Sequence, residues 1–459
     1  TGDLFYSGAW HTWLVGGLGA GGNASGPIGN KTSTAVGAIY ALDITDPGTF
    51  SETNASSLVL GEWSSSTIAC ANVVNCGTRL GSTFGTPVIR RLHNGNWAVL
   101  FGTGLNSSSG TAGMFILLVD ASTGVKTFRF IDTGYGPSRD PLGVNSKNGI
   151  AYVAPADLDG DHITDYVYAG DAFGNIWRFD LTSSNPASWS VSTAPIFSTP
   201  AGQPITSRLA VASVPGVGSG PQRLVFSFGT GQQIPQTLTS AATYATGAQA
   251  LYGIWDWNLS GWNSRAAATA QYASLAAPQT VAVANLQAQA VTSTVAGSGS
   301  VSGYRTISTN TVCWSGSAAC GTGNNKFGWT LPLPTSTEQV VYNPIIAYGM
   351  FVVNTTIPAS SQILTCNTQP AAGYTMAVTM AGGGAARQSF FGDANNNFVS
   401  YGGAIVSGIG LSATGSPSIV TAMKKPYLVQ QTVGGTGVVS QINPGVSGAG
   451  GRLNWIKLR

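Results

Sequence analysis

The sequence predicts an all-β protein, a modified β-propeller of six or seven blades, with seven favoured and with long inserted loops. Two observations indicate this fold. The composition is rich in glycine, with 62 Gly, and poor in charge, with 8% charged residues, and a strand–turn–strand unit recurs along the chain. A pair of β-sandwiches or a β-solenoid is the alternative, but repeated units of blade size favour the propeller.

Each repeated unit has a short apolar strand ending in small residues, a glycine-rich turn, and a second strand that often ends on an acidic residue. The clearest units pair residues 11–17 with 38–43, 97–104 with 114–120, 166–171 with 175–180, and 224–231 with 251–256. Weaker copies pair 350–354 with 374–378, and 428–431 with 453–456. Because one such sheet cannot bury both its faces, we expect neighbouring units to stack.

The segments between these units contain no pattern typical of a long amphipathic helix. Residues 265–286 are rich in Ala and Gln and could hold a turn or two of helix. Residues 286–311 alternate Val, Ser and Thr around a turn at 297–300, which predicts an extended hairpin. No linker divides the chain, so we expect a single domain over 1–459 whose first blade could be incomplete at the N-terminus.

Charge and hydropathy exclude two classes of partner. The formal net charge is +3, and Lys and Arg are scattered without the basic stripe that nucleic-acid binding requires. The longest aliphatic run, residues 114–119, is far too short to span a bilayer. The chain begins at Thr1 without a signal peptide, so we interpret it as a mature portion or fragment.

The five cysteines favour disulfides over a zinc site. Cys70 and Cys76 are close in sequence, as are Cys313 and Cys320, which predicts two local disulfides in an oxidising compartment, with free thiols as the alternative. There is no CxxC motif, and the three histidines are far apart. Cys366 is left over.

The most informative segment is the acidic stretch at residues 157–165, which holds 4 of the 17 acidic residues. Asp157, Asp159, Asp161 and Asp165 occupy positions 1, 3, 5 and 9 of a loop, which is the spacing of a Ca²⁺ loop, with the backbone carbonyl of Ile163 at position 7 as a further ligand. A polar turn in which Asp residues cap backbone amides is the alternative. Mg²⁺ is disfavoured because it prefers few protein carboxylates.

The context of this acidic stretch argues against an EF-hand. Its flanks are strand-like, so we expect the loop to join two strands of one blade, and position 12 is Tyr168 instead of Glu. His162 occupies position 6, where the backbone normally needs a positive φ. A calcium ion held by four carboxylates and a carbonyl leaves little room for a substrate, which favours a structural or regulatory role.

A second candidate loop has Asp393, Asn395 and Asn397 at positions 1, 3 and 5, but Tyr401 at position 9. A degenerate loop or a plain turn is the better interpretation, because a single charge rarely holds Ca²⁺ tightly.

Residues 170–180 resemble the Trp-docking motif of quinoprotein-type propellers, in which a glycine such as Gly174 allows a tight turn and Trp177 packs between blades. The chain has no adjacent cysteines of the kind that such dehydrogenases place against their quinone. Paired catalytic carboxylates are also scarce, so we expect a protein that is not an enzyme. A quinoprotein-like oxidoreductase and a carbohydrate-binding propeller, with exposed Trp189 or Trp262 as sugar platforms, are the alternatives.

Several segments together resemble the C-terminal domain of the PilY-type type IV pilus tip adhesins and assembly factors. They are residues 9–22, 39–47, 156–161, 168–171, 174–181 and 252–256. The resemblance implies a modified β-propeller at the C-terminus of a longer, exported protein found at the pilus tip or outer surface. It also implies partnership with minor pilins, with host or abiotic surfaces as further candidate partners, and a role in pilus biogenesis, twitching motility and adhesion.

The same resemblance implies one Ca²⁺, whose occupancy affects the balance of pilus extension and retraction. The ligands carried over are Asp157, Asp159, Asp161, the carbonyl of Ile163, and Asp165. His162 departs from the more usual Gly and could weaken affinity. The chain has no Arg-Gly-Asp tripeptide, so attachment to integrins through that signal is not expected.

Overall fold

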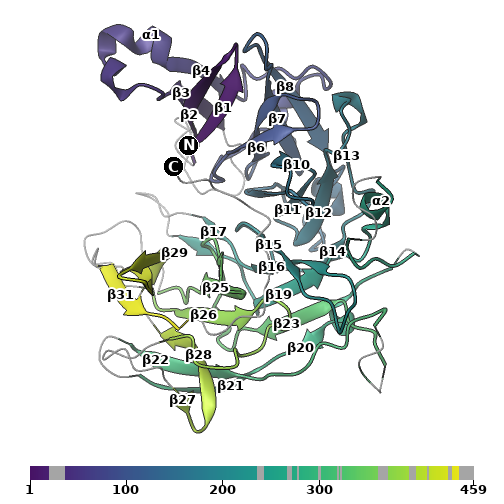
Figure 1. Cartoon of the computed structure of the whole chain (residues 1–459), viewed down its shortest axis with the longest axis vertical. Helices are drawn as coiled ribbons and strands as arrows, with labels where there is room; N and C mark the ends of the chain where they lie inside the picture. Colours follow the sequence, from purple (N-terminus) through teal and green to yellow (C-terminus); the bar gives the residue numbers. More distant parts are fainter. Residues whose placement is uncertain are drawn as a thin grey trace. The chain divides into compact units, whose positions relative to one another are not determined.

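The regular secondary structure of the described residues consists almost wholly of β-strands (Figure 1). The computed structural model describes residues 1–19, 37–234, 242–265, 271–276, 279–297, 301–317, 320, 323–359, 371–391, 400–410, 413–432 and 437–443. Two compact units are present, one formed mainly by Thr1–Ile196 and the other mainly by Phe197–Gln233 and the described part of Thr243–Leu453. The predicted all-β class is confirmed.

The first unit contains three sheets. The first is β1-β2-β3-β4, with strands Gly2–Tyr6, Ala9–Gly17, Ala38–Asp43 and Val59–Ser64. The second is β10-β5-β6-β7-β8, with strands Ile163–Thr164, Val88–Leu92, Trp97–Gly102, Gly113–Val119 and Lys126–Asp132. The third is β13-β12-β11-β9, with strands Ser190–Val191, Asn175–Asp180, Tyr166–Gly170 and Val153–Ala156.

The second unit contains three sheets of three or more strands. The first is β15-β16-β19-β23-β20, with strands Ala210–Val214, Arg223–Gly229, Ala250–Trp255, Gly328–Pro332 and Gln287–Ala288. The next is β21-β22-β28-β26-β25-β24, with strands Val291–Ala296, Gly303–Ile307, Ala404–Gly410, Tyr374–Thr379, Met350–Asn354 and Ile345–Ala347, and with β27 (Ser400–Tyr401) paired to β28. The last is β29-β30-β31, with strands Ala413–Ala422, Lys425–Thr432 and Gly437–Gln441.

The remaining elements are short. The strands are β14 (Phe197–Ser198), and β17 (Gln233–Ile234) paired with β18 (Thr243–Tyr244). The helices are α1 (Ala55–Leu58), α2 (Ser260–Asn263), and the 3₁₀ turns Pro47–Thr49, Glu52–Asn54, Cys76–Arg79, Pro137–Arg139, Pro186–Ser188 and Val283–Asn285. No helix in the described part of the chain is long and apolar enough to cross a membrane.

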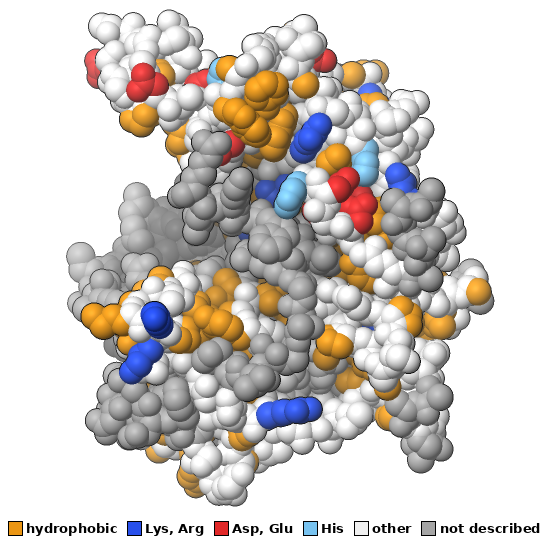
Figure 2. Space-filling model, viewed as in Figure 1, with side chains coloured by type: hydrophobic (Ala, Val, Ile, Leu, Met, Phe, Trp, Pro, Cys, Tyr) orange, Lys and Arg blue, Asp and Glu red, His pale blue; other side chains and the backbone are white. Residues whose placement is uncertain are grey.

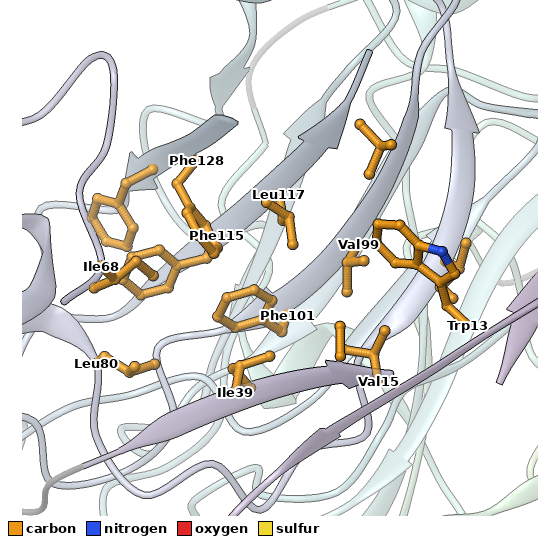
Figure 3. Packing of buried hydrophobic residues seen from close by; sticks show 14 of the residues in the cluster. Trp13, Val15, Ile39, Ile68, Leu80, Val99, Phe101, Phe115, Leu117 and Phe128 are labelled. Carbon is orange, nitrogen blue, oxygen red and sulfur yellow. The ribbon is translucent and has the colours of Figure 1, made fainter. Parts of the chain in front are cut away.

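The first two sheets pack face to face around a core of interleaved apolar side chains (Figure 3). Trp13 and Val15 of β2 meet Val99 and Phe101 of β6 in this core. The alternate β6 residues, such as Leu100, point to the opposite face and join a second core, which contains residues of the third sheet. A strand that is apolar on both faces is what stacked blades require, since each central sheet is covered on two sides.

Trp177 lies fully buried in that second core, and its predicted role as packing between repeated units is confirmed. Gly174 has a φ of 86°, which gives the tight turn expected before β12. The carboxylate of Asp171, also fully buried, accepts hydrogen bonds from Trp177 Nε1 at 2.9 Å and Asn148 Nδ2 at 2.9 Å. It also accepts from the side-chain amide and backbone N–H of Asn175, and from the Phe173 N–H.

Substitution of Asp171 by alanine should therefore lower the free energy of unfolding of the first unit by more than about 3 kcal/mol, because several buried donors lose their acceptor together. Urea denaturation monitored by tryptophan fluorescence measures the loss. Asp46 is the matched control, because its carboxylate is exposed and accepts a single hydrogen bond, from the backbone N–H of Gly48 at 2.9 Å. Asp46→Ala should lower the free energy of unfolding by about 1 kcal/mol or less. Equal losses for both variants would contradict the prediction.

Five of the predicted strand pairs form as antiparallel neighbours: β2 with β3, β6 with β7, β11 with β12, β16 with β19, and β25 with β26. The hairpin expected within 286–311 is β21 with β22. Disulfides Cys70–Cys76 and Cys313–Cys320 are formed. Cys366 and segment 453–456 lie outside the described residues.

The number of blades differs from the expected six or seven. The described residues form five sheets of four or more strands. Five of the six predicted strand pairs each lie in one of these five sheets. The sixth pair adds no further sheet of that size among the described residues, because residues 428–431 lie in β30 of the three-stranded sheet β29-β30-β31 and residues 453–456 lie outside the described residues. The pairing of β28 with both β22 and β26 also places the hairpin β21–β22 in the same sheet as the pair β25–β26.

Candidate metal centre

The acidic loop joins two adjacent strands of the third sheet, as the sequence predicted. It leaves β9 at Ala156 and returns to β11 at Tyr166, and these two residues are direct partners in the antiparallel ladder. Asp165 N–H donates to the Ala156 carbonyl at 3.0 Å, which closes the base of the loop. The residues between are thus presented from a rigid two-stranded stem.

The loop brings three of the four predicted carboxylates together. One carboxylate oxygen from each of Asp157, Asp159 and Asp165 lies within 4.8 Å of the others. Oxygens bound to one Ca²⁺ at about 2.4 Å lie within about 5 Å of each other, so this spacing fits a shared calcium ion. Asp161 lies outside the group, where its Oδ1 accepts a hydrogen bond from Ile163 N–H at 2.8 Å.

Backbone hydrogen bonds shape the rest of the loop. Asp157 accepts from Gly160 N–H at 2.7 Å and from His162 N–H at 2.9 Å, so position 1 holds the turn together through its side chain. His162 has a φ of 67°, which confirms the predicted left-handed backbone at position 6. Gly160 also has a positive φ, 84°, a region that glycine adopts without steric cost.

Asp165 differs from its neighbours because it is completely buried. Its Oδ2 accepts the Leu158 N–H at 2.6 Å, and its Oδ1 lies 2.7 Å from Nε2 of His93. A carboxylate can only accept, so His93 donates through Nε2. Sequence reasoning missed His93, because the residue is 72 positions away and no local motif marks it.

The pKa values of two loop carboxyls reflect this crowding. Burial raises the pKa of Asp165, against the lowering effect of the His93 hydrogen bond. Partial desolvation, and then the negative charge of Asp161, raise the pKa of Asp159. Ionisation of such groups costs stability as the pH rises through the raised pKa, unless a bound cation offsets that cost.

Asp159→Asn should therefore have opposite effects with and without calcium. In chelator at neutral pH the variant should be more stable than the wild type by roughly 1 kcal/mol, the repulsion of two charges about 4 to 5 Å apart in water. In excess calcium it should be the less stable of the two. Thermal unfolding in both buffers measures the reversal, and a shift of the same sign in both would contradict the repulsion argument.

Acidic side chains gather with histidine on the surface of the first unit near β10 (Figure 2). Asp159, Gly160, Asp161 and His162 are the exposed residues of the loop. The second candidate loop at 393–397 lies outside the described residues, so its metal binding stays a prediction.

The proposed sugar platforms were wrong. Trp189 is 7% exposed and Trp262 is 1% exposed. Trp189 Nε1 donates to the Ser183 carbonyl and Trp262 Nε1 to Gln271 Oε1. Both indoles are packed into the protein and present no face for a ligand, because their large apolar rings are buried and each ring N–H has a hydrogen-bond acceptor.

Comparison with known proteins gives consistent results. Residues 2–293 match the sequence model of the PilY1 beta-propeller domain. A type IV pilus biogenesis factor PilY1 from Pseudomonas aeruginosa strain UCBPP-PA14 is 30% identical over 73% of this chain and 27% of its own length. A PilY1 homolog from Xylella fastidiosa strain Temecula1 is 34% identical over 55% of this chain and 16% of its own length.

Among solved structures, the crystal structure of the Pseudomonas aeruginosa PilY1 C-terminal domain aligns with a TM-score of 0.68 and 25% sequence identity, covering 96% of this chain and 82% of that domain. The aligned region covers 27% or less of the length of these two full-length relatives. The acidic loop lies inside the region matched by the propeller-domain sequence model.

Proposed function

Because the chain belongs to the PilY1 β-propeller family, we propose that it is a calcium-binding, non-enzymatic β-propeller that supports type IV pilus biogenesis. The relatives named above are type IV pilus biogenesis factors. The observation that carries the calcium part is the convergence of Asp157, Asp159 and Asp165 within 4.8 Å on a loop closed by paired strands.

The ligand set proposed for the ion is Asp157, Asp159, Asp161, the carbonyl of Ile163, and Asp165. Calcium, when bound, supplies positive charge that offsets the repulsion among these carboxylates. Asp157 holds the turn through Gly160 and His162, and Asp165 anchors the end of the loop to the base of β11. Asp161 is included for its place at position 5 of the loop, because its carboxylate is not one of the three that lie together.

The proposed setting is the pilus tip or the outer surface of the cell, reached by export through the periplasm. There the propeller would bind minor pilins, and calcium occupancy of its loop would affect the balance of pilus extension and retraction. Twitching motility and adhesion to host or abiotic surfaces would follow from that balance. The two disulfides support an oxidising compartment.

Calorimetric titration of chelator-treated protein with CaCl₂ tests the calcium assignment. The wild type should bind one ion per chain, and Asp161→Ala should bind it more weakly, because one charged ligand is lost. Equal binding by the two proteins would remove Asp161 from the ligand set, and absence of saturable binding by the wild type would overturn the calcium proposal itself.

A further inference from the structure

The acidic loop is attached to a second sheet as well as to its own. Its residues Ile163 and Thr164 form β10, which pairs in parallel with Arg91 and Leu92 of β5. In the second sheet β10 is the outermost strand and β5 lies next to it. Without β10, the backbone groups on that side of β5 would form an unpaired sheet edge.

The side chain of Asp165 makes a second connection to the same place. His93 directly follows β5 and donates to Asp165 Oδ1 at 2.7 Å. The backbone of Asp165 belongs instead to the third sheet, since its N–H donates to the Ala156 carbonyl and its carbonyl accepts the Leu181 N–H. One residue thus joins two sheets, through its side chain on one side and its backbone on the other.

We propose that the acidic loop is a calcium-dependent clasp between the second and third sheets, with His93 as the residue that positions Asp165. This inference rests on the proposed calcium binding. The three-carboxylate group includes Asp165, so an ion that fixes this group also fixes the position of Asp165 relative to His93. It fixes Ile163 and Thr164 too, because they lie between two ligand positions, and thereby holds β10 on the edge of β5.

The physical basis is the shortness of β10. The parallel pairing of β10 with β5 involves only two residues on each strand, so it forms few hydrogen bonds. These few bonds must offset the conformational entropy that is lost when the loop becomes ordered. In the absence of a cation, repulsion among Asp157, Asp159 and Asp165 opposes the compact loop. With calcium bound, the electrostatic interactions of these carboxylates favour the compact loop instead of opposing it. The pairing of β10 with β5 should therefore depend on calcium much more than the longer ladder between β5 and β6 does.

Hydrogen exchange measured by mass spectrometry on the full chain tests the clasp. Added CaCl₂ should slow exchange by about 10-fold or more both in the loop at 157–165 and in peptides containing residues 88–93. The strands β15 and β16 of the second unit, far from the loop in sequence, serve as an internal reference and should not change. Protection confined to 157–165 would overturn the clasp while leaving calcium binding intact.

Variants of His93 test its positioning role. His93→Ala should lower calcium affinity by about 10-fold, as loss of a residue that orients a ligand does, and should remove the calcium-dependent protection at 88–93. His93→Gln, which keeps an N–H donor, should recover part of the calcium affinity and part of the calcium-dependent protection at 88–93. His11→Ala is the matched control, because His11 contacts Asp43 at 3.1 Å in the first sheet and not in the sheets that the loop joins. This variant should leave the calcium affinity and the protection at 88–93 unchanged.

A purely structural role for His93 gives a different pattern. In that case His93→Ala would lower the melting temperature equally in calcium and in chelator, with the same calcium affinity as the wild type, and the positioning role would be wrong. A wild type that binds no calcium would overturn the clasp together with the calcium proposal, whereas loss of β5 protection alone overturns only the clasp.

Discussion

Asp165→Asn should lower calcium affinity on the order of 100-fold, the largest effect expected from any single change in the loop. Asp165 is the one buried carboxylate of the group of three, and its two oxygens are fixed by Leu158 N–H and by His93. The substitution therefore removes a charged ligand whose position in the loop is already fixed. Competition with a fluorescent calcium indicator measures the change in affinity.

The control for this prediction is Asp140→Asn. Asp140 holds a different loop by accepting the Leu142 and Ser146 N–H groups, so its loss should leave calcium affinity unchanged. Melting curves in chelator should show that Asp165→Asn is folded. Wild-type affinity in folded Asp165→Asn would place the ion elsewhere in the protein.

Glu338→Ala should destabilise the second unit by about 3–5 kcal/mol, because it leaves a buried guanidinium without its partner. Arg305 on β22 is 1% exposed and Glu338 is 0% exposed. Their contact is bidentate, with Nη1 to Oε1 at 2.6 Å and Nη2 to Oε2 at 2.8 Å. Thr355 Oγ1 also donates to Glu338, and the Tyr374 ring lies 3.4 Å from Arg305 Cζ.

Two further variants show whether the loss comes from an unpaired charge. The double variant Arg305→Met with Glu338→Leu should recover much of the stability, since apolar side chains of similar volume often replace a buried ion pair without loss. Asp132→Asn removes the charge of a partly exposed pair with Arg79 and should cost about 1 kcal/mol or less. The midpoints of urea denaturation measure the stability of Glu338→Ala, of the double variant and of Asp132→Asn. A double variant no more stable than Glu338→Ala would contradict the explanation.

Local patterns in the sequence predicted much of the fold and part of the site. Strand pairs within one unit, such as β6 with β7, are marked by alternating apolar residues around a short turn, so periodicity finds them. The positive φ of His162 followed from its place in the loop. The disulfides followed from cysteines six and seven residues apart. Each of these features depends on residues close together in the chain.

Features that depend on distant residues were missed for the same reason. The contact of His93 with Asp165, the parallel pairing of β10 with β5, and the ion pair of Arg305 with Glu338 all join segments that no local motif connects. The burial of Trp189 and Trp262 depends in the same way on tertiary packing. The pairing of β28 with both β22 and β26 could not be predicted, because the order of strands across a sheet cannot be read from sequence periodicity.

Co-purification of this chain with minor pilins, in calcium and in chelator, tests the account most directly. The account predicts that the wild type retains minor pilins in millimolar CaCl₂ and loses most of them in chelator. Asp165→Asn, which we expect to fold but to bind calcium weakly, should retain few in either buffer. Failure of the wild type to retain minor pilins in calcium, or equal retention by all samples, would contradict a calcium-dependent propeller of the type IV pilus.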